Sequence, residues 1–397
     1  MLIHRLHVYA FCHGLGFHNA LLLPWLKNQF SSDQYEIVFL ILALRTLSQM
    51  VSETQSGRIA NEKGCLHVLR LCTWLRFVAI ICLIIAAIIS NKCMALALVA
   101  TWAVFEGVGS AMYSGADVQL ICRHTQQHHI KRDLSRQRVA WLLSRSISSF
   151  VAWTLITNIY IQMIASLASI ACASFTLYGT TTSTATWMPS KHGAIHDSGT
   201  QDISVNIKHW LKQFVLIPLP LKCMFLYAIT TQVQMETFFK LLPFTMPHHQ
   251  HALPLLTSIG FLCNALGSWI AGRVKHRYTY CQCIFGVNLL YWWWIQPTSD
   301  GRWVIIIVGT YTILPIVWGF HQTALQNQML EQITLNNYHV VTYLSSYKLV
   351  TQWTQIMWMC LFISPLLDIG QWHISHVYGL LACITSLNLF IHRKMHV

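Results

Sequence analysis

The sequence predicts an all-α polytopic membrane protein with twelve transmembrane helices in two six-helix bundles, and three observations support this prediction. Only 10% of the 397 residues are charged and 54% are hydrophobic, whereas a soluble domain carries about 25% charged residues. Long apolar segments recur along the whole chain, and the basic residues between them are unevenly distributed. These features together place most of the chain in a lipid bilayer.

The apolar segments define the predicted helices, because a helix needs about 20 apolar residues to cross about 30 Å of hydrocarbon. The predicted spans are residues 6–27, 35–54, 68–90, 94–116, 138–157, 160–179, 221–243, 252–272, 278–296, 303–322, 341–364 and 372–391. Their number is even, so both termini are expected on the same side of the membrane.

The basic residues indicate the orientation of these helices. Eighteen of the 26 Lys and Arg residues fall in one set of loops or at the span ends beside them, and only Lys27, Lys92 and Arg302 fall on the other side. An excess of Lys and Arg marks cytoplasmic loops, so both termini are expected in the cytoplasm. The net charge of +13 is therefore interpreted as membrane topology and not as a surface for nucleic acid.

The longest stretch outside the spans divides the chain into two halves of six helices. The expected domains are an N-terminal bundle over residues 1–180, a central cytoplasmic linker over residues 181–212 and a C-terminal bundle over residues 213–397. This plan is the expected form of two repeats related by an axis along the membrane normal. Residues 203–214 are predicted to form an amphipathic helix on the membrane surface.

No cofactor or metal site is predicted from the cysteine and histidine residues. The thirteen cysteines are scattered and form no Cys-x-x-Cys pair, so neither a disulfide framework nor a thiolate metal site is indicated. Residues 122–129 and 248–251 each contain several potential ligands, but neither group has the spacing of a recognised metal site.

A glycine-led, charged segment separates the second and third predicted helices. Its pattern, Gly57-x-x-Ala60-Asn61-x-x-Gly64, resembles the loop between helices 2 and 3 of the major facilitator superfamily of transporters. Glycine permits a tight turn and the close approach of helices. The resemblance implies a cytoplasmic hairpin that takes part in closing the inner gate.

The segment departs from the family pattern at positions that carry charge. Asn61 stands where the family usually has Asp, and the two residues after Gly64 are not basic. In the family these charges hold the inner gate shut while the outer gate is open. The resemblance therefore implies a weakened gate, to which Arg58 and Lys63 still contribute.

Three further segments carry the resemblance. Residues 113–117 (YSGAD) are similar to the inner end of helix 4 in some bacterial members, and they place Asp117 to pair with a basic residue of the first loop. Gly267 to Arg273 (GSWIAGR) lie where the second repeat would hold its copy of the loop motif. Residues 325–346 resemble the loop between helices 10 and 11.

Four ionisable residues lie within predicted helices that line the central cavity of this fold, namely Arg45, Glu106, Arg145 and Lys348. A charge at bilayer depth costs at least about 2.5–3.5 kcal/mol, so it normally faces a cavity or a partner. One interpretation is a structural ion pair of Glu106 with Arg45 or Arg145. The other is a proton site at Glu106, with arginines holding an anionic group of a substrate. Arg76 is predicted to be structural and near the bundle periphery.

Polar residues in the first and seventh helices add weaker candidates. Gln234 is a candidate substrate contact, and Glu236 and His18 are secondary proton candidates. Glu236 and Lys240 are four residues apart and can neutralise each other on one helix face. His13 is interpreted as a packing residue, and histidine can carry a proton near neutral pH.

The resemblance implies a secondary transporter that works by alternating access, and not an enzyme. We expect a small organic substrate, anionic or zwitterionic, coupled to protons, with efflux favoured over uptake. We also expect a monomer in the bilayer of a bacterial inner membrane. The alternative is a non-transporting receptor or sensor that retains the transporter fold, which the altered loop at Asn61 favours.

Overall fold

The computed structural model of the chain is helical throughout the parts that it describes. These are residues 2–17, 22–30, 36–113, 115–125, 129–154, 158–178, 219–241, 252–274, 278–294, 303–335, 351–352 and 374–395. No β-strand occurs in these ranges. A helix satisfies its own backbone hydrogen bonds, which is the condition for crossing a bilayer without an edge.

Thirteen helices are described. Those of the first half are α1 (Leu2–Gly14), α2 (Leu22–Phe30), α3 (Glu36–Lys63), α4 (Cys65–Ile88), α5 (Lys92–Tyr113), α6 (Ala116–His124), α7 (Ile130–Thr154) and α8 (Ile159–Tyr178). Those of the second half are α10 (Leu219–Leu241), α11 (Leu253–Ala271), α12 (Tyr278–Trp294), α13 (Trp303–Leu335) and α16 (Ile374–Met395).

Four stretches of the described chain are long and apolar enough to cross a membrane. They are Cys65–Ile88, Lys92–Cys122, Ile159–Tyr178 and Pro254–Ala271. The total of twelve spans and the cytoplasmic termini therefore stay predictions. The predicted span 341–364, apart from residues 351 and 352, and the linker 181–212 with its amphipathic helix lie outside the described residues.

The first predicted span, residues 6–27, is not one continuous helix. Helix α1 ends at Gly14 and α2 begins at Leu22. Beyond Gly14 the backbone forms a tight turn, in which the amide of Gly16 donates to the carbonyl of Gly14 at 2.8 Å. Two glycines within three residues lower the helix propensity here. A side chain at Gly14 would also overlap Ser144 of α7, so glycine lets α1 and α7 pack closely.

The predicted loop between the second and third spans, residues 55–67, was too long. Helix α3 continues to Lys63 and α4 begins at Cys65, so only Gly64 leaves the helical conformation. Its φ of 89° lies in the left-handed region that L side chains rarely adopt. Gly57 therefore lies inside α3. Gly115, with a φ of 91°, makes the corresponding break between α5 and α6.

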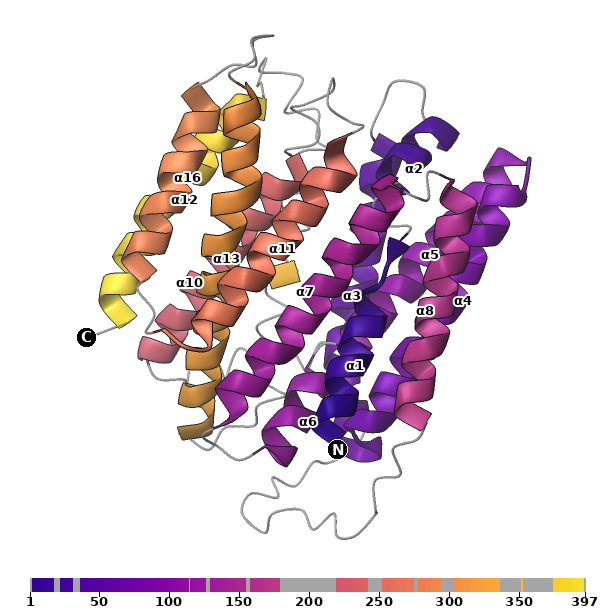
Figure 1. The fold of residues 1–397 in the computed structure, drawn as a ribbon, viewed down its shortest axis with the longest axis horizontal. Helices are drawn as coiled ribbons and strands as arrows, with labels where there is room; N and C mark the ends of the chain where they lie inside the picture. Colours follow the sequence, from indigo (N-terminus) through magenta and orange to yellow (C-terminus); the bar gives the residue numbers. More distant parts are fainter. Residues whose placement is uncertain are drawn as a thin grey trace.

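The two halves of the chain meet along α7 and α11, which cross the centre of the molecule side by side (Figure 1). Ser146 and Ser258 exchange hydrogen bonds in which each hydroxyl donates to the other residue's carbonyl at 2.9 Å. Further along the same pair of helices, the hydroxyl of Ser135 donates to the carbonyl of Ser268 at 2.6 Å. Small polar residues of this kind let membrane helices approach closely and hold them together.

Replacing Gly267 with Ala is expected to destabilise the chain by about 1–3 kcal/mol, because overpacking forces two closely packed helices apart. A Cβ atom at Gly267 of α11 would overlap the carbonyl group of Ile316 in α13. Thermal unfolding of the purified chain in detergent measures the effect. Gly309→Ala in α13 is the matched control, since nothing lies within 4 Å of a Cβ atom built there. An equal loss of stability in both variants would contradict the prediction.

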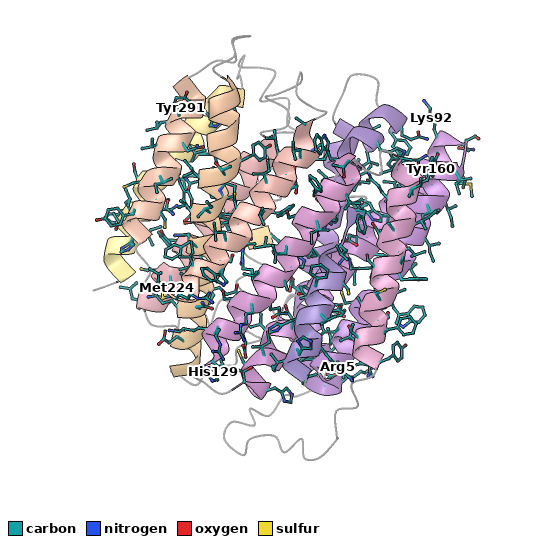
Figure 2. The ribbon with its side chains drawn as sticks, viewed as in Figure 1. Arg5, Lys92, His129, Tyr160, Met224 and Tyr291 are labelled. Carbon is teal, nitrogen blue, oxygen red and sulfur yellow. The ribbon has the colours of Figure 1, made fainter. Side chains whose placement is uncertain are left out.

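The labelled side chains identify the two ends of the molecule. Arg5 and His129 lie at the end where the chain begins, and Lys92 and Tyr160 lie at the opposite end (Figure 2). The sequence places Arg5 and Lys92 on opposite sides of the membrane, so this arrangement agrees with the predicted direction of the first helices.

Candidate functional site

A cavity of about 470 Å³ lies between helices of both halves of the chain. Helices α1, α3, α4, α5 and α7 supply most of its wall, and α13 supplies Gln322 and Gln326. The wall is mainly charged or hydrogen-bonding, and its aliphatic members are Val118 and Leu134. Such a surface suits a polar solute, because an apolar one would leave these groups without partners.

The centre of the cavity wall is a buried cluster around Glu106. Arg76 donates from Nε to Glu106 Oε2 at 3.0 Å, and its Nη2 lies 3.0 Å from Oε1, which makes the pair bidentate. Arg45 is a looser partner, with its Nη2 3.6 Å from Oε1. Glu106 and Arg76 are only 3% and 4% exposed. Buried charges of this kind are stable only when they are paired.

Glycines next to Glu106 allow the cluster to form. The segment from Glu106 to Ser110 reads EGVGS. A side chain at Gly107 would overlap the backbone of Arg45 in α3, and a Cβ atom at Gly109 would lie 2.9 Å from Cγ of Arg76 in α4. The two glycines thus let α3 and α4 approach α5 from neighbouring directions and bring both arginines to the same carboxylate.

The prediction that Arg76 lies near the bundle periphery is wrong. Its guanidinium is buried between Glu106 and His13, and Nη1 lies 2.7 Å from His13 Nε2 and 3.0 Å from Nδ1. Helix α4 is apolar around most of its circumference, so the hydrophobic pattern could not indicate which face is buried. His13, interpreted from the sequence as a packing residue, is likewise part of the site.

Arg145 lines the same cavity but has no carboxylate partner. Its guanidinium carbon lies 5.0 Å from the ring centroid of Trp141, one turn earlier in α7. Among the described residues, Arg145 forms no ion pair, and its buried Nε has no hydrogen-bond partner. Of the two ion pairs considered from the sequence, the structure contains Arg45–Glu106 and not Arg145–Glu106.

The remaining charged groups of the wall, Asp117 and Arg138, each bond to a glutamine amide. Asp117 accepts a hydrogen bond from Gln137 Nε2 at 2.8 Å, and it is buried. Arg138 donates to Gln322 of α13, which links α7 to the second half of the chain. Four arginines and two carboxylates line the cavity in all, so its wall carries an excess of positive charge.

Gln234 does not line this cavity. Its amide donates to the carbonyl of Leu381 at 3.0 Å and to the hydroxyl of Thr385 at 2.8 Å, and it accepts from Asn388 at 3.3 Å. These contacts tie α10 to α16 inside the second half. His18 and Lys348 lie outside the described residues, as does the side chain of Glu236 in α10.

The residues predicted for the gate are spread over the end of the molecule near Arg5. Gly64 makes its turn there and Lys63 is exposed, while the side chains of Arg58 and Asn61 lie outside the described set. Arg273 is also exposed and stacks on Trp269, with its guanidinium carbon 3.7 Å from the ring centroid.

Two further contacts join the halves near the gate residues. Lys131 Nζ in α7 lies 2.6 Å from Glu331 Oε2 in α13. Gln352 donates to Glu53 Oε1 of α3 at 3.3 Å. Neither contact was predicted, because each joins residues that are at least 200 positions apart in the sequence.

Solved structures of transporters share this fold, including the following three. A D-xylose-proton symporter matches with a TM-score of 0.69 and 12% identity, over 98% of this chain and 95% of that one. The proton:xylose symporter XylE bound to 6-bromo-6-deoxy-D-glucose matches with a TM-score of 0.70 and 13% identity, over 99% and 94%. A partially occluded inward-open form of XylE from E. coli matches with 0.71 and 11%, over 99% and 96%.

No family model and no curated protein sequence matches this chain. The structural matches show that the chain shares the fold of these transporters over nearly its whole length, as the resemblance to the major facilitator superfamily implied. The twelve spans and their division into two bundles of six stay predictions. The matching proteins are membrane transporters and not enzymes.

Proposed function

We propose that the chain is a multi-pass secondary transporter that moves a small organic anion or zwitterion by alternating access through this cavity. The observation that supports it most directly is Arg145, a cavity-lining guanidinium without a carboxylate partner among the described residues. A guanidinium presents a fork of donors that suits a carboxylate or a phosphate. Trp141, which lines the same cavity, lies beside this guanidinium, with its ring centroid 5.0 Å from the guanidinium carbon.

Proton coupling would act through Glu106. Arg45 is the looser of its two arginine partners, at 3.6 Å, and it is therefore the one that can transfer to a substrate anion. When a substrate anion pairs with Arg45, Glu106 loses part of the positive charge that neutralises it. A proton bound to Glu106 can then neutralise the carboxylate instead. The anion and the proton would then occupy the cavity together, which couples their movements.

The location and direction of transport belong to the same proposal. The apolar helices and the loop pattern favour a monomer in a bacterial inner membrane, with small solutes, protons and lipid as its partners and no nucleic acid. The sequence resemblance favours export. The coupling described above permits movement in either direction, because the imposed gradients determine the net flux.

Uptake into proteoliposomes that contain the purified chain tests the proposal. A panel of radiolabelled carboxylates, phosphate esters, amino acids and neutral sugars is offered under an imposed pH gradient of each polarity. We expect gradient-driven movement of an anionic or zwitterionic solute, and we expect Glu106→Gln to uncouple that movement from the gradient. Movement of neutral solutes alone would refute the substrate class. Binding without movement would favour the sensor alternative instead.

A further inference from the structure

The guanidinium of Arg76 has hydrogen-bond partners on two sides, and the partners on the two sides differ in chemistry. Glu106 supplies a carboxylate on one side, while His13 supplies its ring and its carbonyl oxygen on the other. The Nη1 nitrogen of Arg76 lies within 3.0 Å of both ring nitrogens and 3.2 Å from the carbonyl oxygen. A guanidinium has donors only and keeps its proton in proteins. His13 must therefore face it as a neutral imidazole that accepts.

The surroundings of His13 offer nothing that would hold a proton on its ring. Tyr113 of α5 stacks on it at 4.5 Å between centroids, Tyr9 of α1 lies 5.4 Å away, and the thiol of Cys72 in α4 lies 3.5 Å from Nε2. Arg145 of α7 lines the same cavity. Among the described residues no carboxylate contacts the imidazole, since Glu106 contacts Arg76 instead.

We propose that His13 is a proton-responsive positioning residue, and that its protonation is linked to anion binding in the cavity; the anion part of this inference rests on the proposed function. An imidazolium cannot accept from Arg76, and it would place a second positive charge about 3 Å from the guanidinium, where the two repel. Arg76 would then leave the ring, and the cavity wall would gain one positive charge.

The linkage between the proton on His13 and the anion in the cavity acts in both directions. If a proton on His13 strengthens anion binding, an anion in the cavity must strengthen proton binding to His13 by the same factor. His13 would thus be a second residue, besides Glu106, whose protonation affects anion binding in the cavity. It lies on α1, whereas Glu106 lies on α5. Its role would be to position Arg76, without contact between the imidazole and the substrate.

The first test needs no substrate and compares thermal unfolding of the full chain in detergent at about pH 7.5 and about pH 5.5. The unfolded chain takes up a proton on each histidine below about pH 6.5. A histidine that the fold keeps neutral therefore lowers stability as the pH falls. His13→Gln keeps an acceptor for Arg76 but cannot be protonated. His4→Gln, at an exposed histidine of the same helix, is the matched control.

We expect the unfolding temperature of the native chain and of His4→Gln to fall by about 1–3 °C more than that of His13→Gln over this pH range, which is the shift that excluding one proton can produce in a chain of 397 residues. A His13 that takes up a proton equally well in the folded and unfolded chain would instead make the stability difference between His13→Gln and the native chain the same at both pH values. Parallel pH profiles of the native chain and His13→Gln would overturn the inference, whether or not the chain transports a solute.

The second test measures the linkage to anions. D-gluconate and methanesulfonate stay ionised across this range, and each is added at an ionic strength matched with sodium chloride. We expect their stabilisation of the native chain to be at least about twofold larger at the lower pH, and independent of pH in His13→Gln. Equal stabilisation at both pH values in the native chain, or none by either anion, would overturn the linkage. The uptake panel tests transport separately, so failure of the proposed function is distinguishable.

Discussion

Replacing Arg76 with Gln is expected to destabilise the protein by about 3–5 kcal/mol, because it removes the principal partner of a buried carboxylate. Glu106 is 3% exposed, and of its two arginine partners the looser one, Arg45 at 3.6 Å, would remain. Such a change is large against the total stability of a folded domain, which is about 5–15 kcal/mol. Unfolding of the purified chain in detergent, followed by circular dichroism, measures the loss.

The double variant Arg76→Gln with Glu106→Gln provides the decisive comparison. It leaves two neutral amides that can bond to each other, so we expect it to recover at least half of the stability lost in Arg76→Gln. Lys131→Gln is the matched control for losing an ion pair, because Lys131 and Glu331 have side-chain exposures of 54% and 48%. That exposed pair should contribute no more than about 1 kcal/mol. If the double variant is no more stable than the single one, the buried pair is not the cause.

Replacing Arg145 with Gln is expected to raise the KM for the transported anion by about 10- to 150-fold, which corresponds to losing a hydrogen bond to a charged group worth about 1.5–3 kcal/mol. Folding should change little, because Arg145 has no carboxylate partner among the described residues whose charge would be left unpaired. Initial rates of uptake into proteoliposomes, over a range of anion concentrations, measure the change.

Two variants make the Arg145 result specific. Arg145→Lys keeps the charge and loses the planar fork, so we expect it to recover only part of the affinity. Arg132→Gln removes an exposed arginine of the same helix, α7, and we expect its KM to equal that of the native chain. An unchanged KM in Arg145→Gln would place the anion elsewhere in the cavity.

Part of the candidate site was predictable from residue type and depth alone. Arg45, Glu106 and Arg145 were identified because a charge in the middle of an apolar segment needs a partner or a cavity. The structure brings all three to one cavity wall. Arg76 meets the same criterion, but it was predicted at the periphery because its helix, the third span, is not among those that line the cavity in the family that the chain resembles. His13 was not located because a single histidine carries no periodic signal. The EGVGS segment was a usable signal, because two glycines beside a membrane-embedded carboxylate indicate that other helices pack closely there.

The helix boundaries, like the site residues, were predictable only in part. The glycines of the second loop were recognised, but the sequence did not distinguish Gly57, which stays within α3, from Gly64, which turns the chain. Charged residues near Lys63 suggested a loop, yet they are equally compatible with a helix that continues beyond the bilayer. Gln234 illustrates the converse case, because its polarity suggested a substrate contact while the structure satisfies it within the second half of the chain.

The sequence by itself predicted a helical membrane protein with a major facilitator fold, since hydrophobic length, loop charge and glycine spacing are local properties of the chain. Only the tertiary structure decided which charges meet. The partners Glu106, Arg76 and His13 come from three helices, and Arg145 has no carboxylate partner among the described residues because of how α7 packs against α1 and α11. Pairing across helices depends on their relative rotation and close approach, which no local pattern of residues encodes.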